Sequence, residues 1–197
     1  MKKTTVAFGE LMLRLAPPGV ERFLQSPHFQ ASFGGGEANV AVALAQFGLP
    51  AMYCTVLPDN NVIADAAIGE LRRFGVDTSK IVRGKGRMGV YYIEAGANQR
   101  PSKVIYDREH SAIALATRGA LDWDNILEGA LWYHLTGITP AINASAADLA
   151  LESLSKAREK GVTVSCDLNY RKNLWKFGKA ATEVMPGKDS RRVSSRS

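Results

Sequence analysis

Short apolar runs alternate with segments of helical periodicity along this chain, and this alternation restricts its fold more than any other feature. Uninterrupted apolar runs predict strands buried on both faces, as in parallel sheets, and apolar residues three and four positions apart predict helices that cover them. The predicted strands are 6–8 continuing through 11–15 toward a sheet edge, 51–57, 131–135 and 162–167, and the predicted helices are 36–47, 65–74 and 145–160. This order predicts an α/β fold with a doubly wound, mostly parallel sheet.

An antiparallel ribbon interrupts this rhythm between residues 89 and 108. Two strand-like runs, 90–94 and 103–106, are joined by a short connection that contains Gly96. The alternation of side chains in a strand puts Tyr106 and Arg108 on one face, and Tyr91 with Ile93 on one face of the facing strand.

The tyrosines and Arg108 suit a sugar acid, because a guanidinium group binds a carboxylate through two parallel charge-assisted hydrogen bonds. A neutral sugar does not require this charge. The alternative is a solvated Arg108 beside Asp107 and Glu109, with tyrosines that only favour strand formation.

A glycine-rich turn precedes the predicted helix 36–47. A dinucleotide-binding G-x-G-x-x-G motif that starts at Gly34 needs glycine at position 39, and a P-loop needs Gly-Lys-Ser/Thr, so both are excluded. A polar helix start that binds hydroxyl groups remains, and its alternative is a loop in which Asn39 only caps the helix. The candidate binding residues are Gly34, Gly35, Gly36, Glu37, Ala38 and Asn39.

The strand 162–167 runs directly into a polar turn that contains Asp167, Asn169 and Arg171. Ligands of parallel sheets bind outside such carboxyl ends of strands. The alternative is that Asp167 and Asn169 only cap the turn.

Three segments in this order resemble the ribokinase, or PfkB, family. Gly35-Gly36-x-x-Asn39, followed by small residues and Gly48, is similar to the family's first signature, and Asp167-x-Asn169-x-Arg171 is similar to its segment between the sugar and the nucleotide. The family pattern expects a glycine where this chain has Pro58. Residues 57–60 and 100–108 resemble the branch of 2-keto-3-deoxygluconate kinases.

The resemblance implies a ribokinase-like fold with a small antiparallel β lid made of residues 12–33 and 89–108. It implies the transfer of a phosphoryl group from ATP, bound with Mg²⁺, to the 6-hydroxyl group of 2-keto-3-deoxygluconate. Tyr91, Tyr106, Arg108 and Arg171 join the glycine turn as sugar-binding residues, and Asn169 and Arg171 are the expected nucleotide contacts. Two alternatives stay open: a sugar-acid-binding module without catalysis, and a family kinase for a neutral sugar such as fructose or ribose.

The family's catalytic Gly-Ala-Gly-Asp segment does not occur in the 197 residues, so the resemblance assigns no catalytic residue to this chain. We expect a kinase domain over 1–185 that is incomplete at its C-terminus through truncation or a shifted reading frame. Its sheet is then expected to have an uncovered edge and low stability. We expect residues 186–197 to form a disordered tail outside the family sequence.

Composition excludes several other classes of function. Half of the net charge of +6 lies in the last ten residues, so no nucleic-acid-binding face is needed to explain it. No long apolar run or signal peptide occurs, which predicts a cytoplasmic protein without a membrane segment. Two cysteines and three separated histidines do not form a metal site. We expect a small-molecule sugar acid as the ligand and a homodimer paired through the lid.

Overall fold

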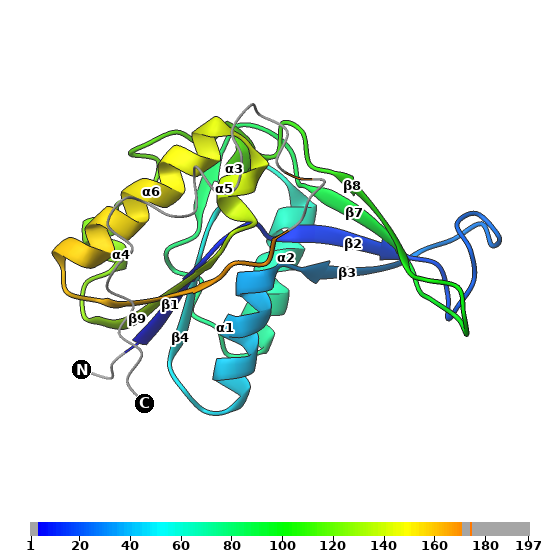
Figure 1. Cartoon of the computed structure of the whole chain (residues 1–197), viewed down its shortest axis with the longest axis horizontal. Helices are drawn as coiled ribbons and strands as arrows, with labels where there is room; N and C mark the ends of the chain where they lie inside the picture. Colours follow the sequence, from blue (N-terminus) through cyan, green and yellow to red (C-terminus); the bar gives the residue numbers. More distant parts are fainter. Residues whose placement is uncertain (1–3, 171–173, 175–197) are drawn as a thin grey trace.

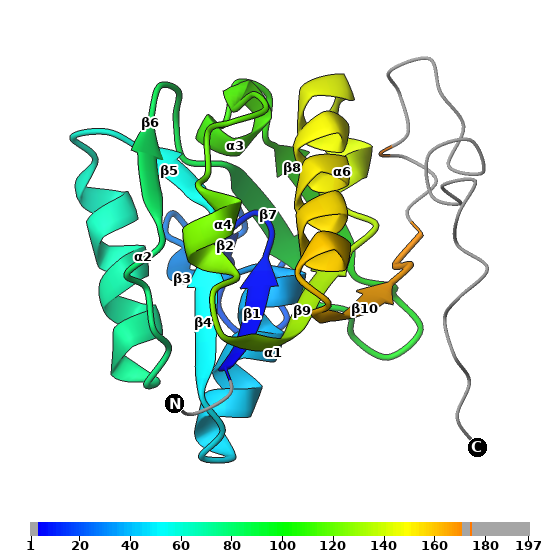
Figure 2. The ribbon, with the colours of Figure 1, turned by 90° about the vertical axis from the view of Figure 1, so that its left-hand side faces the viewer.

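The computed structural model describes residues 4–170 and residue 174. Four parallel strands in the order β10-β9-β1-β4 form the central sheet. Figure 1 shows this sheet between two layers of helices, and Figure 2 shows β10 beside β9 at one side of it. The strands are β1 (Thr4–Phe8), β4 (Ala51–Cys54), β9 (Ala130–Thr136) and β10 (Thr163–Asp167).

The alternation of side chains along β1 explains why helices cover both faces of the sheet. Ala7 packs into a buried cluster with residues of α1 (Gly36–Gln46) and α2 (Val62–Arg73). Val6 and Phe8 point to the other face and pack into a second cluster. The helices on that side are α3 (Ala112–Leu115), α4 (Trp123–Ile126) and α6 (Ala144–Glu159), and α5 (Thr139–Ile142) leads into α6.

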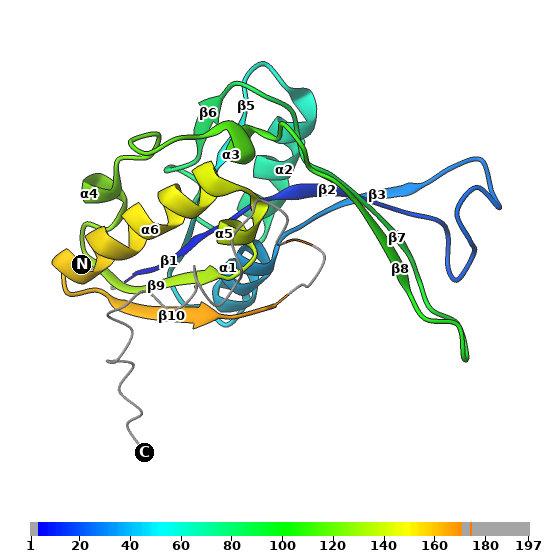
Figure 3. The same ribbon diagram turned by 45° about the horizontal axis from the view of Figure 1, so that its top comes forward.

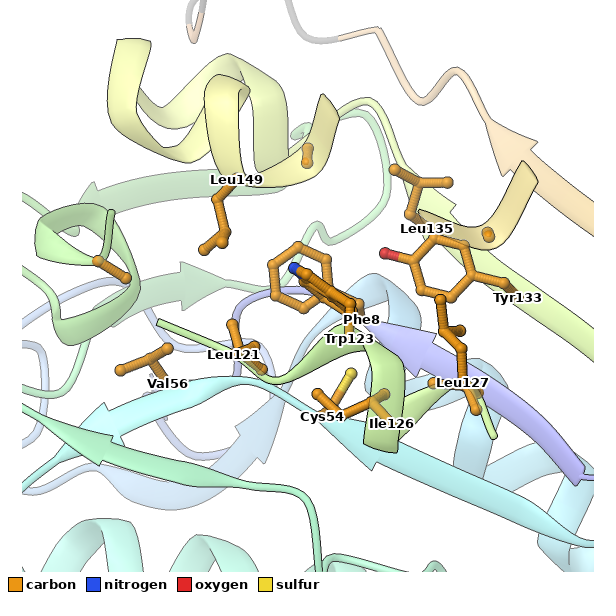
Figure 4. Packing of buried hydrophobic residues seen from close by; sticks show 14 of the residues in the cluster. Phe8, Cys54, Val56, Leu121, Trp123, Ile126, Leu127, Tyr133, Leu135 and Leu149 are labelled. Atoms are coloured by element: carbon orange, nitrogen blue, oxygen red, sulfur yellow. The ribbon is translucent and has the colours of Figure 1, made fainter. Parts of the chain in front are cut away.

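Aromatic rings from three elements form the centre of the second cluster (Figure 4). The ring of Trp123 meets that of Phe8 edge to face at a centroid distance of 5.0 Å and that of Tyr133 at 6.1 Å. The hydroxyl group of Tyr133 donates to Ser153 Oγ at 2.7 Å, so the polar end of this fully buried side chain has a partner. This core fixes the position of β9 against α6.

A second four-stranded sheet, the lid, extends away from the body of the molecule (Figures 1 and 3). Its strand order is β3-β2-β7-β8, in which the central pair β2 and β7 is parallel and the outer pairs are antiparallel. Its strands are β2 (Met12–Ala16), β3 (Gln30–Gly34), β7 (Val90–Glu94) and β8 (Lys103–Asp107). Near the base of the lid, β5 (Val56–Pro58) and β6 (Val82–Gly84) form a small parallel pair.

The predicted doubly wound, mostly parallel fold with a small lid sheet is confirmed. The prediction of an antiparallel lid was wrong for its central pair, because β2 and β7 are parallel. Two predicted strands were wrong in their extent, because the chain leaves the central sheet at Gly9 and again at Thr55. Residues 6–8 and 11–15 therefore lie in two different sheets, and residues 51–57 divide between β4 and β5. Arg171 and residues 186–197 lie outside the described residues.

Candidate functional site

The lid has one face packed against the body and one face free of it. Leu13 and Phe33 lie on the packed face and join the buried cluster of α1 and α2. The strand register puts Ser32, Arg14, Tyr91 and Tyr106 in one row across the four strands, on the opposite face. We call this the inner face of the lid, and it is the candidate ligand-binding face.

Tyr91 and Tyr106 are direct cross-strand partners on the inner face. Their ring centroids lie 6.0 Å apart, and a Cβ atom on Gly34 would come within 2.7 Å of the Tyr91 hydroxyl group. Glycine at position 34 therefore gives the Tyr91 side chain its space. Burial raises the pKa of Tyr91, and the nearby positive charge of Arg14 lowers it in part. The pairing of β7 with β8 thus puts the two tyrosines together on one face.

Arg108 lies at the base of the inner face and forms a buried ion pair with Glu10. Arg108 Nε donates to Glu10 Oε2 at 2.8 Å, Nη2 donates to the same oxygen, and both residues are less than 10% exposed. The Arg108 guanidinium carbon lies 5.6 Å from the centroid of the Tyr106 ring. The alternative of a solvated Arg108 beside Asp107 is therefore wrong, and Asp107 pairs with Arg87 instead.

Two polar atoms of this ion pair are buried without a hydrogen-bond partner among the described residues: Arg108 Nη1 and Glu10 Oε1. A buried donor without a partner costs free energy unless a ligand or water satisfies it. Among the described residues, Arg108 Nη1 is therefore a donor without an acceptor, although Glu10 balances the charge of the guanidinium group. The sequence alone does not identify the partner of Glu10, which lies 98 positions away.

The glycine turn joins the lid to the body. Gly35 is the N-cap of α1 in an extended conformation, and a Cβ atom there would lie 2.2 Å from the backbone oxygen of Glu10. No side chain caps this helix, so the alternative of Asn39 as its cap is wrong. Asn39 lies on the side of α1 that faces α2, where it lines a pocket of about 100 Å³ with Gly34 and Phe74.

Glu37 points into the interior and not toward the lid. Its Oε1 atom accepts hydrogen bonds from Thr136 N at 3.0 Å, Thr136 Oγ1 at 2.8 Å and Thr139 Oγ1 at 3.3 Å. Burial raises the pKa of this carboxyl group. Ala38, beside it, belongs to the buried cluster of α1 and α2. In the structure, Glu37 and Ala38 thus join α1 to the rest of the body.

The end of β10 lies next to the glycine turn. Asp167 Oδ1 accepts a hydrogen bond from Asn169 N at 2.9 Å, so Asp167 does cap this turn. A Cβ atom on Gly36 would lie 3.4 Å from Thr136 and 3.8 Å from the amide nitrogen of the Asn169 side chain. The glycine turn and the segment after β10 therefore lie side by side at Gly36 and Asn169.

The described residues do not form a complete nucleotide or metal site. Asn169 is the single expected nucleotide contact among them, and one amide cannot hold a triphosphate. No group of three His, Cys, Asp or Glu side chains within residues 4–170 is placed to bind a metal ion. Among the helices of this part of the chain, none combines the length and apolar composition that a membrane span requires.

Comparisons with known proteins agree with this geometry. The chain is 39% identical over 175 residues to a 2-dehydro-3-deoxygalactonokinase of Haloferax volcanii, an alignment that covers 89% of this chain and 54% of the relative. The crystal structure of 2-dehydro-3-deoxygluconokinase from Thermotoga maritima matches with a TM-score of 0.85 and 54% identity over 88% of this chain and 53% of that one.

A fructokinase from Xylella fastidiosa with bound ATP matches with a TM-score of 0.80 and 26% identity, over 94% of this chain and 54% of that one. The chain thus spans about half the length of the relatives it matches. Residues 2–189 match the family description "pfkB family carbohydrate kinase". The chain belongs to the PfkB family of carbohydrate kinases.

Proposed function

We propose that this chain supplies the sugar-binding part of an ATP-dependent kinase for 2-keto-3-deoxy sugar acids, with 2-keto-3-deoxygluconate as the first candidate substrate and its 6-hydroxyl group as the acceptor. The relatives from Haloferax volcanii and Thermotoga maritima, whose names specify such sugar acids, support this choice. The chain would take part in catalysis through substrate binding and lid closure, and we assign no catalytic base to it.

The composition of the inner face of the lid carries the proposal. Tyr91 and Tyr106 offer aromatic surface, Arg108 keeps a free donor at Nη1, and Arg14 adds a cation in the same row of the sheet. Aromatic rings pack against the apolar face of a sugar ring, and guanidinium groups bind carboxylates more strongly than they bind neutral hydroxyl groups. A sugar acid uses both features.

Phosphoryl transfer depends mainly on positioning and on stabilising the developing negative charge. ATP supplies the phosphoryl group when it is bound. The residues of this chain would hold the sugar between the lid and the ends of β9 and β10, with Asn169 and Arg171 at the boundary with the nucleotide. Closure of the lid over this space would exclude water from the acceptor hydroxyl group.

A kinase for a neutral sugar is the runner-up, because the Xylella fastidiosa fructokinase has the same fold. The two functions differ in their need for a carboxylate. In calorimetric titrations of this chain, we expect 2-keto-3-deoxygluconate to bind and fructose and ribose to give no heat above dilution. Equal or tighter binding of fructose would contradict the proposal.

An assay of ATP turnover on the same preparation separates binding from catalysis. We expect no turnover by this chain with saturating sugar acid, since we assign no base to it. Sugar-dependent ADP formation that follows the protein through purification would show that this chain does contain a base.

A further inference from the structure

The lid consists of two segments that are far apart in sequence, and the backbone pairing between them ends before the tip of the lid. One segment contains β2, β3 and the loop 17–29 between them, and the other contains β7, β8 and the connection 95–102. The pairing of β2 with β7, which joins the two segments, covers residues 13–15 of β2. Beyond it, both connections extend to the end of the lid that is far from the body (Figures 1 and 3). Contacts other than this ladder therefore decide whether the tip stays together.

Glu94 and Arg100 make these contacts, and we call them the tip pair. Glu94 ends β7 and is 8% exposed, and its Oε2 atom accepts a hydrogen bond from Phe23 N at 3.0 Å. Its Oε1 atom lies 3.8 Å from Arg100 Nη1. Arg100 Nη2 donates to Val20 O in one lid segment and, at 3.2 Å, to Ala95 O in the other. The tip pair thus connects the loop 17–29 to the end of β7.

The loop 17–29 has few other contacts. Among the described residues, its hydrogen bonds to the rest of the lid are the two that end on the tip pair, and its other hydrogen bonds are internal to the loop. A ring contact between Phe29 and Tyr92, at a centroid distance of 6.0 Å, lies at the end of the loop that leads into β3. Leu24 is exposed and has a φ of 61°, in the left-handed region that bulky side chains avoid. A loop with so little burial depends on the contacts that hold its middle.

We infer that the tip pair makes the two segments of the lid move as one body, because it holds the loop 17–29 to the end of β7. Glu94 is almost withdrawn from water, so its charge depends on Arg100. Arg100 in turn is positioned by Glu94 to donate to carbonyl oxygens of both segments. Removal of either charge leaves the other unpaired and weakens both hydrogen bonds of the loop. This inference goes beyond the proposed function and does not depend on it.

The test measures the opening of the loop in the whole 197-residue chain. Arg22 is exposed within the loop, so the rate of tryptic cleavage between Arg22 and Phe23, followed by mass spectrometry, reports its opening. Hydrogen exchange of the Phe23 amide reports the loss of its hydrogen bond to Glu94. Urea unfolding of each protein shows whether it is folded under the conditions of the cleavage assay.

The variants are Glu94→Gln, Arg100→Gln and the double variant. Asp107→Asn is the matched control, because it removes a charge from the exposed ion pair with Arg87 in the same lid. We expect each single variant to raise the cleavage rate about tenfold and to speed the exchange of the Phe23 amide, as local opening does. The double variant should be cleaved at about the rate of the single variants, since residues that act only through each other are not additive. Asp107→Asn should be cleaved as the wild type is.

A folded Glu94→Gln variant that is cleaved at the wild-type rate overturns the inference. A double variant whose increase is the product of the two single increases also overturns it, because the two residues would then act independently. If Glu94→Gln does not fold, Arg100→Gln, whose side chain is 25% exposed in the wild type, decides in the same way. Global unfolding of both single variants counts against the inference too, since the pair would then support the whole fold and not the tip of the lid.

Discussion

Arg108, directly after the lid strand β8, and Glu10, two residues before β2, form a buried ion pair across 98 positions of sequence. The side chains of Glu10 and Arg108 are 4% and 10% exposed. The ion pair connects the segment that enters β2 to the segment that leaves β8. Because both charges are withdrawn from water, each depends on its partner.

Removal of one charge from this pair should destabilise the protein strongly. We expect Glu10→Gln to lower the free energy of unfolding by about 3 kcal/mol, because it leaves the Arg108 charge buried and unpaired. Urea unfolding followed by circular dichroism measures this loss. Glu70→Gln, which breaks the exposed pair with Arg73, is the matched control and should cost less than about 1 kcal/mol. Equal losses in the two variants would contradict the role of burial.

Because of Glu37, we expect the free energy of unfolding to depend on pH. Burial raises the pKa of its carboxyl group above the ordinary 4.5. The folded protein therefore binds this proton more tightly than the unfolded chain does. The contribution of the Glu37 proton to the free energy of unfolding is fully present below about pH 4.5. It is lost as the pH rises through the pKa of Glu37 in the folded protein.

Glu37→Gln should remove this dependence while it keeps an oxygen acceptor for Thr136 and Thr139. We expect the free energy of unfolding of the variant to rise relative to that of the wild type as the pH increases above about 4.5. The gain is about 1.4 kcal/mol for each unit between the folded and unfolded pKa. Urea titrations at several pH values measure it, with exposed Glu128→Gln as the control. A constant difference across this range would contradict the prediction.

Local periodicity explains the part of the fold that could be predicted from the sequence. The apolar periods predicted α1, α6 and the central strands, and the two-residue period of β8 predicted that Tyr106 and Arg108 share one face. Both features follow from neighbours in the chain.

The contacts that define the site are different, because they join residues far apart in sequence. Nothing near Glu10 indicates Arg108, and nothing near Glu37 indicates Thr136, which is 99 positions away. The two-residue period of β2 puts Arg14 on the face opposite Leu13. The pairing of β2 with β7 was needed to show that this is also the face of Tyr91.

A substitution at Gly35 tests how closely the segment before β2 approaches the start of α1. A Cβ atom at this position would lie 2.2 Å from the backbone oxygen of Glu10, which cannot move without the strand β2. We expect Gly35→Ala to lower the free energy of unfolding by about 1–3 kcal/mol, as overpacking does. Gly69→Ala in α2, where no atom lies within 4 Å, should be neutral or stabilising by about 0.5–1 kcal/mol. A Gly35→Ala variant as stable as Gly69→Ala would contradict the close approach.

A substitution of Tyr106 tests which face of the lid binds the sugar. We expect Tyr106→Ala to weaken the binding of 2-keto-3-deoxygluconate about tenfold, or about 1.4 kcal/mol, because the sugar loses an aromatic surface and Arg108 loses its neighbouring ring. Tyr92→Ala is the control, since Tyr92 lies on the opposite face beside Phe29. Calorimetric titration measures both variants. A larger loss for Tyr92→Ala would place the ligand on the other face.

The outer edge of β8 makes the lid a candidate surface for pairing with a second copy of the chain. Among the described strands β8 has one neighbour, β7, and Val104, Ile105 and Tyr106 are 39%, 44% and 45% exposed. An unprotected edge of this kind pairs readily with another strand. In a two-fold antiparallel pairing each side chain of one copy lies near the same segment of the other.

Ile105→Lys should therefore prevent this dimer, because it brings the two introduced ammonium groups close together and removes apolar contact. We expect light scattering to show a dimer mass for the wild type at high concentration and a monomer mass for the variant. Leu115→Lys places the same change on an equally exposed residue of α3, away from the lid, and should leave the dimer intact. A wild-type monomer mass at every concentration would contradict the pairing. Loss of the dimer in both variants would instead indicate a contact that is not made through β8.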